Sequence, residues 1–138
     1  PLKSTSLMSF KEIAVGDHSF QEKEKPMRLK DLIENPLISL GQGSTTYEFY
    51  SKFFLENDLV LSPDTEVETI DQVLPLIMNG LGIGFLPELF VRPVIEEGKV
   101  CQIPLKENIP EREICLVENH TFPPSIAADM FKKMLVLK

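Results

Sequence analysis

The stretch that most constrains the fold is Gly80-Leu81-Gly82-Ile83-Gly84-Phe85-Leu86-Pro87. It follows a predicted helix and leads into a predicted strand, which is the wrong order for a dinucleotide-binding loop. Gly80 is the type of residue that ends a helix in a left-handed conformation, and we expect Gly82 and Gly84 at closely packed strand positions. The stretch therefore predicts a helix, a stop and a tightly packed strand.

Segments with the periodicity of strands and of helices alternate along the rest of the chain. The charged residues 21–26 are expected to form a loop. Strands are expected at 10–15, 37–40, 65–69, 82–86, 100–104 and 113–118, and helices at 29–33, 46–57, 70–79, 89–96 and 125–135. This order predicts an α/β fold with a largely parallel or mixed sheet flanked by helices.

Two of the predicted helices begin with the pattern of a capping box, in which a hydroxyl and a Glu or Gln three residues later satisfy helix-end N–H groups. Thr45 with Glu48 is one such pair, and Thr69 with Gln72 is the other. Pro75 lies inside the second of these helices. We expect it to remove one hydrogen bond and to kink the helix.

The composition is that of an ordinary globular protein. The 138 residues carry 14 Lys or Arg against 21 Asp or Glu, a formal net charge of −7, and 43% of them are hydrophobic. Such a chain can bury a core, which excludes disorder throughout. The negative charge argues against direct nucleic-acid binding, which needs clustered Lys and Arg. No apolar stretch reaches membrane-spanning length, so no membrane partner is expected.

Residues that could carry chemistry are few. Cys101 and Cys115 are expected to be reduced core residues of a cytoplasmic protein, with no metal site and no cofactor, because no second thiol or histidine lies at ligand spacing. Ser44 lacks the Gly-x-Ser-x-Gly pattern of a nucleophile elbow, and His18 and His120 fall in turn-like segments. The sequence therefore predicts no catalytic residue.

The best candidate for a binding site is Gly41-Gln42-Gly43-Ser44-Thr45-Thr46, between a predicted strand and a predicted helix. Its glycines let the backbone approach a ligand, and the N–H groups at the helix start favour a carboxylate, phosphate or sulfate. The hydroxyl groups of Ser44, Thr45 and Thr46 add further donors. Helix capping alone explains the same pattern, and the two interpretations are compatible. No Lys follows Gly43, which excludes a P-loop.

In their order and spacing, several segments resemble the ligand-binding region of LysR-type transcriptional regulators. The resemblance covers most of the chain and departs from the family at Ser19, where Pro is common, and at Pro75. The segments that carry it are 10–15 with His18-Ser19-Phe20, Leu29-Lys30-Asp31-Leu32, Pro36-Leu37-Ile38, Gly43-Ser44, Glu66-Val67-Glu68-Thr69, 80–87, Gly98-Lys99-Val100, 113–118, and Ala127-Ala128 with Phe131.

The resemblance implies a periplasmic-binding-protein-like (type II) fold, in which a small organic acid or amino-acid-like effector binds between two lobes. Residues 1–105 would form the second lobe, and 106–138 the strand and helix that return to a mostly absent first lobe. Gly43, Ser44, Thr45 and Thr46 would line the cleft, and Thr69 would approach it. DNA would be bound by a winged helix-turn-helix absent from this chain, in a parent homo-oligomer that is expected to be a tetramer.

Two further expectations complete this interpretation. A solute-binding lobe of the same architecture is the alternative function, because fold alone does not fix function. The strand 114–117 and the helix face of Ile126, Met130 and Met134 would normally pack partly on the missing lobe. Exposed apolar surface of this kind predicts at least a dimer. The chain begins at Pro1 and not at Met, which indicates part of a longer protein.

Overall fold

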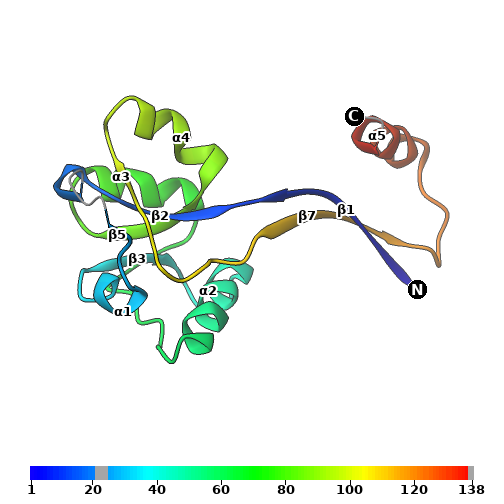
Figure 1. Ribbon diagram of the computed structural model, residues 1–138. Coiled ribbons are helices and arrows are strands. Elements are labelled where there is room, and N and C mark those ends of the chain that lie inside the picture. The colour runs from blue at the N-terminus through cyan, green and yellow to red at the C-terminus, as the bar shows by residue number, and fades with distance from the viewer. Residues whose placement is uncertain (21–24, 137–138) are drawn as a thin grey trace. The chain divides into compact units, whose positions relative to one another are not determined.

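The computed structural model describes residues 1–20 and 25–136, and the chain divides into two compact units (Figure 1). The larger unit is Lys11–Pro110, and the smaller unit combines Pro1–Phe10 with Glu111–Lys138. The first ten residues therefore belong with the C-terminal strand and helix. The assignment of 1–105 and 106–138 to two lobes of a larger domain stays a prediction. Residues 21–24 of the predicted loop lie outside the described residues.

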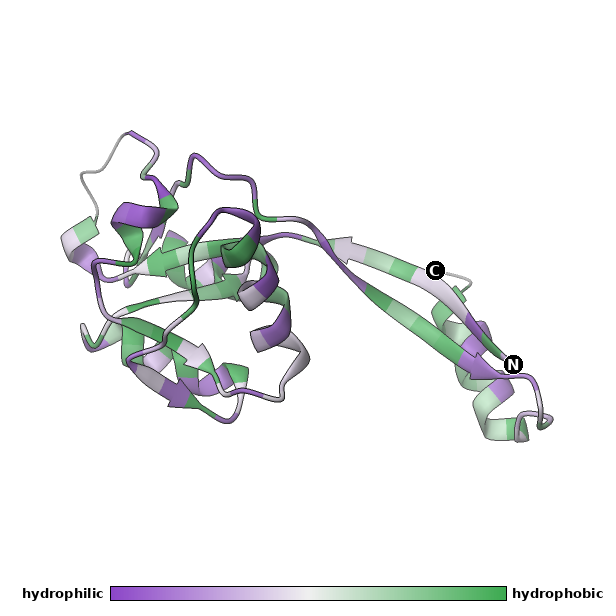
Figure 2. Ribbon diagram, turned by 90° about the horizontal axis from the view of Figure 1, so that it is seen from below, coloured by the Kyte–Doolittle hydropathy of each residue, from purple (hydrophilic) through white to green (hydrophobic). Residues whose placement is uncertain are grey.

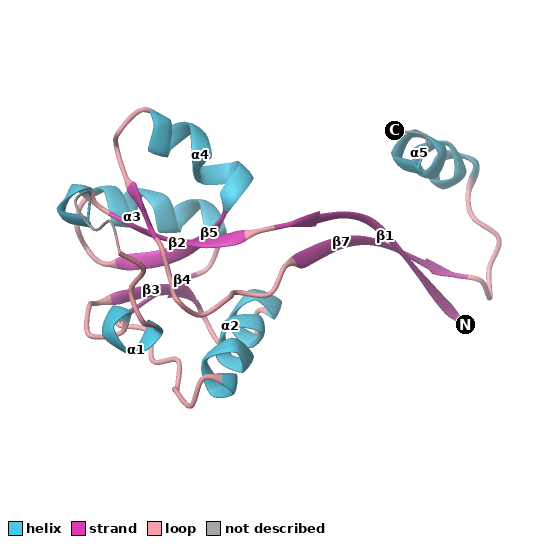
Figure 3. Ribbon diagram, in the orientation of Figure 1, coloured by secondary structure: helices cyan, strands magenta, loops and turns pink. Residues whose placement is uncertain are grey.

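A five-stranded mixed sheet forms the centre of the larger unit (Figure 3), as the sequence predicts. The strand order is β4-β3-β5-β2-β6. Strand β3 runs parallel to β4 and β5, whereas β2 runs antiparallel to β5 and β6. The strands are β2 (Glu12–Gly16), β3 (Leu37–Leu40), β4 (Thr65–Val67), β5 (Ile83–Pro87) and β6 (Cys101–Ile103).

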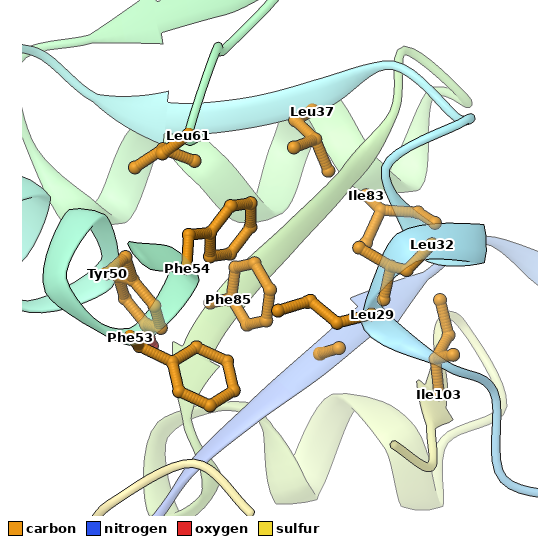
Figure 4. Close-up of a cluster of buried hydrophobic side chains, with 11 residues drawn as sticks. Leu29, Leu32, Leu37, Tyr50, Phe53, Phe54, Leu61, Ile83, Phe85 and Ile103 are labelled. Atoms are coloured by element: carbon orange, nitrogen blue, oxygen red, sulfur yellow. The ribbon is translucent and has the colours of Figure 1, made fainter. Parts of the chain in front are cut away.

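Helices cover both faces of this sheet (Figure 3) and enclose two hydrophobic cores. Helices α1 (Leu29–Leu32) and α2 (Thr45–Glu56) pack on the first face. Figure 4 shows Tyr50, Phe54 and Phe85 gathered in this core, and the rings of Tyr50 and Phe85 stack with centroids 4.6 Å apart. Helices α3 (Val73–Met78) and α4 (Glu88–Glu96) enclose the second core. Figure 2 shows that the central strands are mainly hydrophobic.

The Gly80–Pro87 stretch is closely packed, as predicted. Gly80 has φ 73° and ends α3. A Cβ atom added to Gly82 would lie 2.5 Å from the backbone oxygen of Pro36. A Cβ atom added to Gly84 would lie 2.7 Å from Cγ1 of Val73 and 3.0 Å from Cδ1 of Ile77. Because real atoms do not approach so closely, the absence of a side chain at Gly84 is what lets α3 lie against β5.

Helix α2 begins one residue earlier than the sequence predicts. Its N-cap is Ser44, whose Oγ accepts a hydrogen bond of 3.0 Å from the backbone N–H of Tyr47. The predicted capping box of Thr45 with Glu48 is therefore wrong, because Thr45 is already helical and the extended residue before the helix is Ser44. Both residues carry the required hydroxyl, so composition alone does not separate them.

The helix predicted over 70–79 is divided in two. A 3-10 turn, η2 (Ile70–Gln72), precedes α3, and the capping box of Thr69 with Gln72 is confirmed at its start. Pro75 lies in the first turn of α3, where N–H groups have no helical partner. The predicted loss of a hydrogen bond is therefore wrong.

The smaller unit contains a strand that the sequence does not reveal. Strand β1 (Leu2–Phe10) pairs antiparallel with β7 (Arg112–Asn119). Strand β1 ends at Phe10, Lys11 belongs to no strand, and β2 begins at Glu12, whereas the sequence predicts one strand over 10–15. β1 is rich in Ser and Thr and lacks a clear apolar alternation. Helix α5 (Ile126–Val136) joins β7 through an ion pair of 2.7 Å between Nζ of Lys132 and Oε1 of Glu118.

The contact at Gly84 gives a first prediction. Gly84→Ala should lower the free energy of unfolding by about 1–3 kcal/mol, because the new methyl group overpacks the second core. Combining it with Val73→Ala, which removes the clashing Cγ1, should cost less than the sum of the two single variants. Urea unfolding followed by circular dichroism measures all three. An unchanged stability of Gly84→Ala would contradict the close approach of α3.

The N-cap of α2 gives a second prediction. Ser44→Ala should cost about 1 kcal/mol, because one helix-end N–H loses its acceptor. Thr45→Ala is the matched control and should cost nothing, since Ala is the better helix former at a helical position. The same unfolding experiment compares them. Equal losses, or a larger loss for Thr45→Ala, would show that the cap is assigned to the wrong residue.

Candidate functional site

A small hollow opens in the larger unit where β3 ends and α2 begins. Its volume is about 10 Å³, room for about one water molecule. The side chains of β3 change from buried at Leu37 and Ile38 to half-buried at Ser39 and Leu40, so the strand becomes accessible at its carboxyl end. The hollow is lined by Ile38, Ser39, Leu40, Thr46, Tyr50, Ile70, Val73 and Phe85.

The turn between β3 and α2 lies between two residues that line this hollow, Leu40 and Thr46. Gly43 has φ 93°, a conformation that residues with a side chain rarely adopt. Ser44 Oγ donates a hydrogen bond of 3.0 Å to the backbone oxygen of Gly41 and accepts one from the N–H of Tyr47. The turn is thereby fixed by its own hydrogen bonds, and Thr46 follows as the first residue of α2 that reaches the hollow.

Tyr50, which lines the hollow, forms a buried polar pair with Glu12. The hydroxyl of Tyr50 donates a hydrogen bond of 2.5 Å to Oε2 of Glu12. Both residues are buried, with 3% of Tyr50 and 6% of Glu12 exposed. Tyr50 is one helical turn beyond Thr46, so both side chains lie on the same face of α2. The buried carboxyl of Glu12 thus fixes the ring of Tyr50 at the hollow.

The surroundings of the hollow carry negative charge. A Cβ atom added to Gly41 would lie 3.3 Å from Oε2 of Glu66, so this carboxylate lies against the turn. Next to Ile70, which lines the hollow, a hydrogen bond from the Thr69 side chain lowers the pKa of Asp71. Asp71 is therefore ionised at neutral pH.

The structure distributes the five predicted site residues unevenly. Thr46 lines the hollow, and Thr69 immediately precedes Ile70, which also lines it. Ser44 is occupied as the N-cap, whereas the backbone of Gly43 and the side chain of Thr45 are exposed. Whether these five residues bind a ligand stays a prediction.

Ser39 and Tyr50 are lining residues that the sequence analysis missed. The i, i+4 spacing of Thr46 and Tyr50 on a predicted helix is a signal that points to Tyr50. Ser39 is a polar residue within an apolar strand, two positions before the glycine turn. Without a known helix start, neither signal separates a binding position from a core position.

A larger cavity, of about 350 Å³, lies within the smaller unit between β7 and α5. Its lining is mainly apolar and includes Phe122, Phe131 and Leu116. Oε2 of Glu118 is buried there without a hydrogen-bond partner among the described residues. Its size exceeds that of the hollow at β3, and its polar lining residues include Glu118 and Lys132, which are paired with each other, together with Asn119, His120 and Asp129. It does not lie at the end of a strand with parallel neighbours. We therefore take the smaller hollow as the candidate site.

The other sequence predictions on chemistry concern cysteines, metals and membranes. Cys115 is exposed on β7, so the prediction that it is a core residue is wrong. Cys101 is half-buried, and its burial raises the pKa of the thiol. Within 1–20 and 25–136, no three His, Cys, Asp or Glu side chains are grouped so as to hold a metal ion. The same residues contain no helix with the length and apolarity that crossing a membrane requires.

Comparisons with known proteins agree with this fold. The chain is similar to the uncharacterized HTH-type transcriptional regulator YwqM of Bacillus subtilis, with 29% identity over 100 residues, which is 72% of this chain and 33% of YwqM. Its fold matches the effector-binding domain of QuiR in complex with shikimate, with a TM-score of 0.82, 18% identity and coverage of 99% of this chain and 64% of that one.

The regulatory domain of CcmR from Synechocystis PCC6803 in complex with 2-PG has the same fold. Its TM-score is 0.85 at 13% identity, and the match covers 99% of this chain and 66% of that one. This chain thus spans a third of its curated relative and about two thirds of the two solved structures. The family model of the LysR substrate binding domain matches residues 2–136. The chain therefore belongs to the LysR substrate-binding domain family.

Proposed function

We propose that this chain is the effector-sensing part of a LysR-type transcriptional regulator and that it binds a small molecule at the carboxyl end of β3. The observation that carries the proposal is the hollow on which Ser39, Thr46 and Tyr50 converge. Ligands of open α/β folds bind outside the carboxyl ends of parallel strands, and β3 has parallel neighbours on both sides. The ligand-bound states of the QuiR and CcmR domains support the same function.

In this proposal the site combines the predicted residues with the two that the structure adds. Thr46, Ser39 and Tyr50 contact the effector from the hollow. Gly43, Ser44 and Thr45 form its border, and Thr69 approaches it from the start of η2. The effector is a small organic acid or an amino-acid-like molecule. No step of catalysis is assigned to these residues.

The proposal extends to the partners of the whole regulator. DNA is bound by a winged helix-turn-helix outside this chain, because a net charge of −7 opposes contact with phosphates. The regulator acts in the cytoplasm as a homo-oligomer, a tetramer when complete. A solute-binding lobe remains the alternative, and the similarity to the regulator YwqM favours the sensor.

Ligand binding can be tested by thermal shift on the 138-residue chain, with a panel of amino acids and organic acids that includes shikimate. At least one compound should raise the melting temperature, because a ligand that binds the folded state stabilises it. Thr46→Val removes one hydroxyl from the hollow and should weaken binding by up to about tenfold. Ser62→Ala, an exposed change elsewhere in the larger unit, should have no effect on binding. A panel without any shift would overturn the effector site.

We also propose that the smaller unit associates with a second copy of the chain. Its helix α5 has no buried residue among its described positions, and Ile126, Met130 and Met134 are 84%, 61% and 67% exposed along one face. Phe122 and Val117 add exposed apolar surface in the same unit. Contiguous apolar surface of this kind is rare on soluble monomers and marks interaction sites.

Light scattering at high micromolar concentration tests this association. The chain should have at least the mass of a dimer, and Met130→Glu should shift it toward the monomer, because a charge is placed on the associating face. Ser62→Glu adds the same charge to the larger unit and should leave the mass unchanged. A monomeric mass for the unsubstituted chain contradicts the proposal.

A further inference from the structure

Glu12 is the one charged side chain that is buried among the residues that the structure describes. Burying a carboxyl group is costly, and an apolar residue of similar volume is often at least as stable in such a place. The residues that follow Glu12 in β2 are apolar and buried, namely Ile13, Ala14 and Val15. Stability alone therefore does not account for the carboxyl group at this position.

The carboxyl group of Glu12 holds a residue of the candidate site. Its Oε2 accepts the hydrogen bond of 2.5 Å from the hydroxyl of Tyr50. The ring of Tyr50 stacks on that of Phe85 and lies nearly perpendicular to that of Phe49, with centroids 4.6 Å and 5.0 Å apart. Because these two rings restrict the ring of Tyr50, a ligand that displaces Tyr50 in the hollow also displaces its hydroxyl relative to Glu12.

Glu12 is also the second residue of the larger unit, directly after Lys11, where the chain enters that unit. In the pairing of β2 with β5, Glu12 lies opposite Pro87. The backbone oxygen of Lys11 accepts a hydrogen bond of 2.8 Å from the N–H of Glu88, the first residue of α4. This bond ties the entry of the chain to the start of α4. Glu12 therefore connects α2 at the hollow with the entry of the chain into the larger unit.

We infer that Glu12 couples the effector site to this entry. A ligand that moves Tyr50 changes the setting of Glu12 and, through the backbone, the hydrogen bond between Lys11 and Glu88. The inference rests on the proposed function and adds a means of regulation to the same site. Glu12 does not line the hollow and acts through Tyr50, so it is a positioning residue. Coupling between two places is reciprocal, so a change at the entry also reaches Tyr50.

Amide hydrogen exchange, measured by NMR spectroscopy on the isotopically labelled 138-residue chain, tests the coupling without a ligand. Tyr50→Phe keeps the ring and removes the hydroxyl that donates to Glu12. Exchange of the Glu88 N–H should become about tenfold faster, because a buried carboxyl group has lost a donor beside it. The N–H of Ile83, at the other end of β5, donates to the backbone oxygen of Pro36 at 2.8 Å. Its exchange should change by less than about threefold.

Two further variants control for a general loss of stability. Glu12→Gln keeps an acceptor for the hydroxyl of Tyr50 and should leave exchange of the Glu88 N–H as it is in the unsubstituted chain. Tyr47→Phe makes the same change as Tyr50→Phe on the same helix, at a residue that does not line the hollow, and should have no effect.

The reverse direction is tested at the entry itself. Glu88→Pro removes the N–H that donates to Lys11, and Pro is well tolerated at the first position of a helix. It should shift the NMR signals of the Tyr50 ring. It also removes the ion pair of Glu88 with Arg92, so Arg92→Gln is the matched control and should leave the ring signals in place.

The outcomes distinguish coupling from packing alone. Equal acceleration at Glu88 and Ile83 in Tyr50→Phe, or no acceleration at Glu88, would overturn the coupling. Acceleration by Glu12→Gln as large as that by Tyr50→Phe would overturn the role of the hydrogen bond. Ring signals of Tyr50 that stay in place in Glu88→Pro would also contradict the inference. Since no ligand is used, these failures leave the effector site standing, whereas a thermal-shift panel without any shift refutes that site itself.

Discussion

The alternation of side chains along the central strands of the larger unit is the constraint on which the rest of that unit depends. Successive residues of β2 enter different cores: Ala14 faces α1 and α2, whereas Ile13 and Val15 face α3 and α4. In β5, Phe85 and Leu86 divide in the same way. A shift of one residue in the pairing of β2 with β5 would exchange the two sets, so both cores fix one register.

This burial on both faces leaves the ends of the strands as the places where a ligand can reach the sheet. Strand β3 is buried at Leu37 and Ile38 and half-buried at Ser39 and Leu40, so its carboxyl end is the accessible one. The glycine turn then reverses the chain so that the first turn of α2 lies over the strand end. Tyr50 belongs at once to the first core and to the hollow, because its ring stacks on Phe85 while its hydroxyl bonds to Glu12.

The sequence predicts the larger unit well because nearly every element there carries its own periodic signal. The predicted strand 37–40 coincides with β3 at Leu37–Leu40, and the predicted helix 89–96 differs from α4 by one residue. β1 was missed because tertiary pairing with β7, and not its own pattern, makes it a strand. The sequence pattern predicts Thr45 as the cap because Glu48 follows three residues later, whereas the backbone conformation shows that the cap is Ser44. That Ser39 and Tyr50 line the hollow likewise follows from the three-dimensional structure and not from the sequence pattern.

The smaller unit is held by a different balance of forces. Its two strands pair through the backbone with an irregularity between Ser6 and Met8, and α5 adds the ion pair of Lys132 with Glu118. A two-stranded sheet is at best marginally stable in water, and an ion pair with Lys132 40% exposed contributes little. Apolar burial is what such a unit lacks, and its apolar side chains are the ones left exposed on α5. Association through that face would therefore stabilise the unit itself, so folding of this part of the chain and its self-association are expected to be coupled.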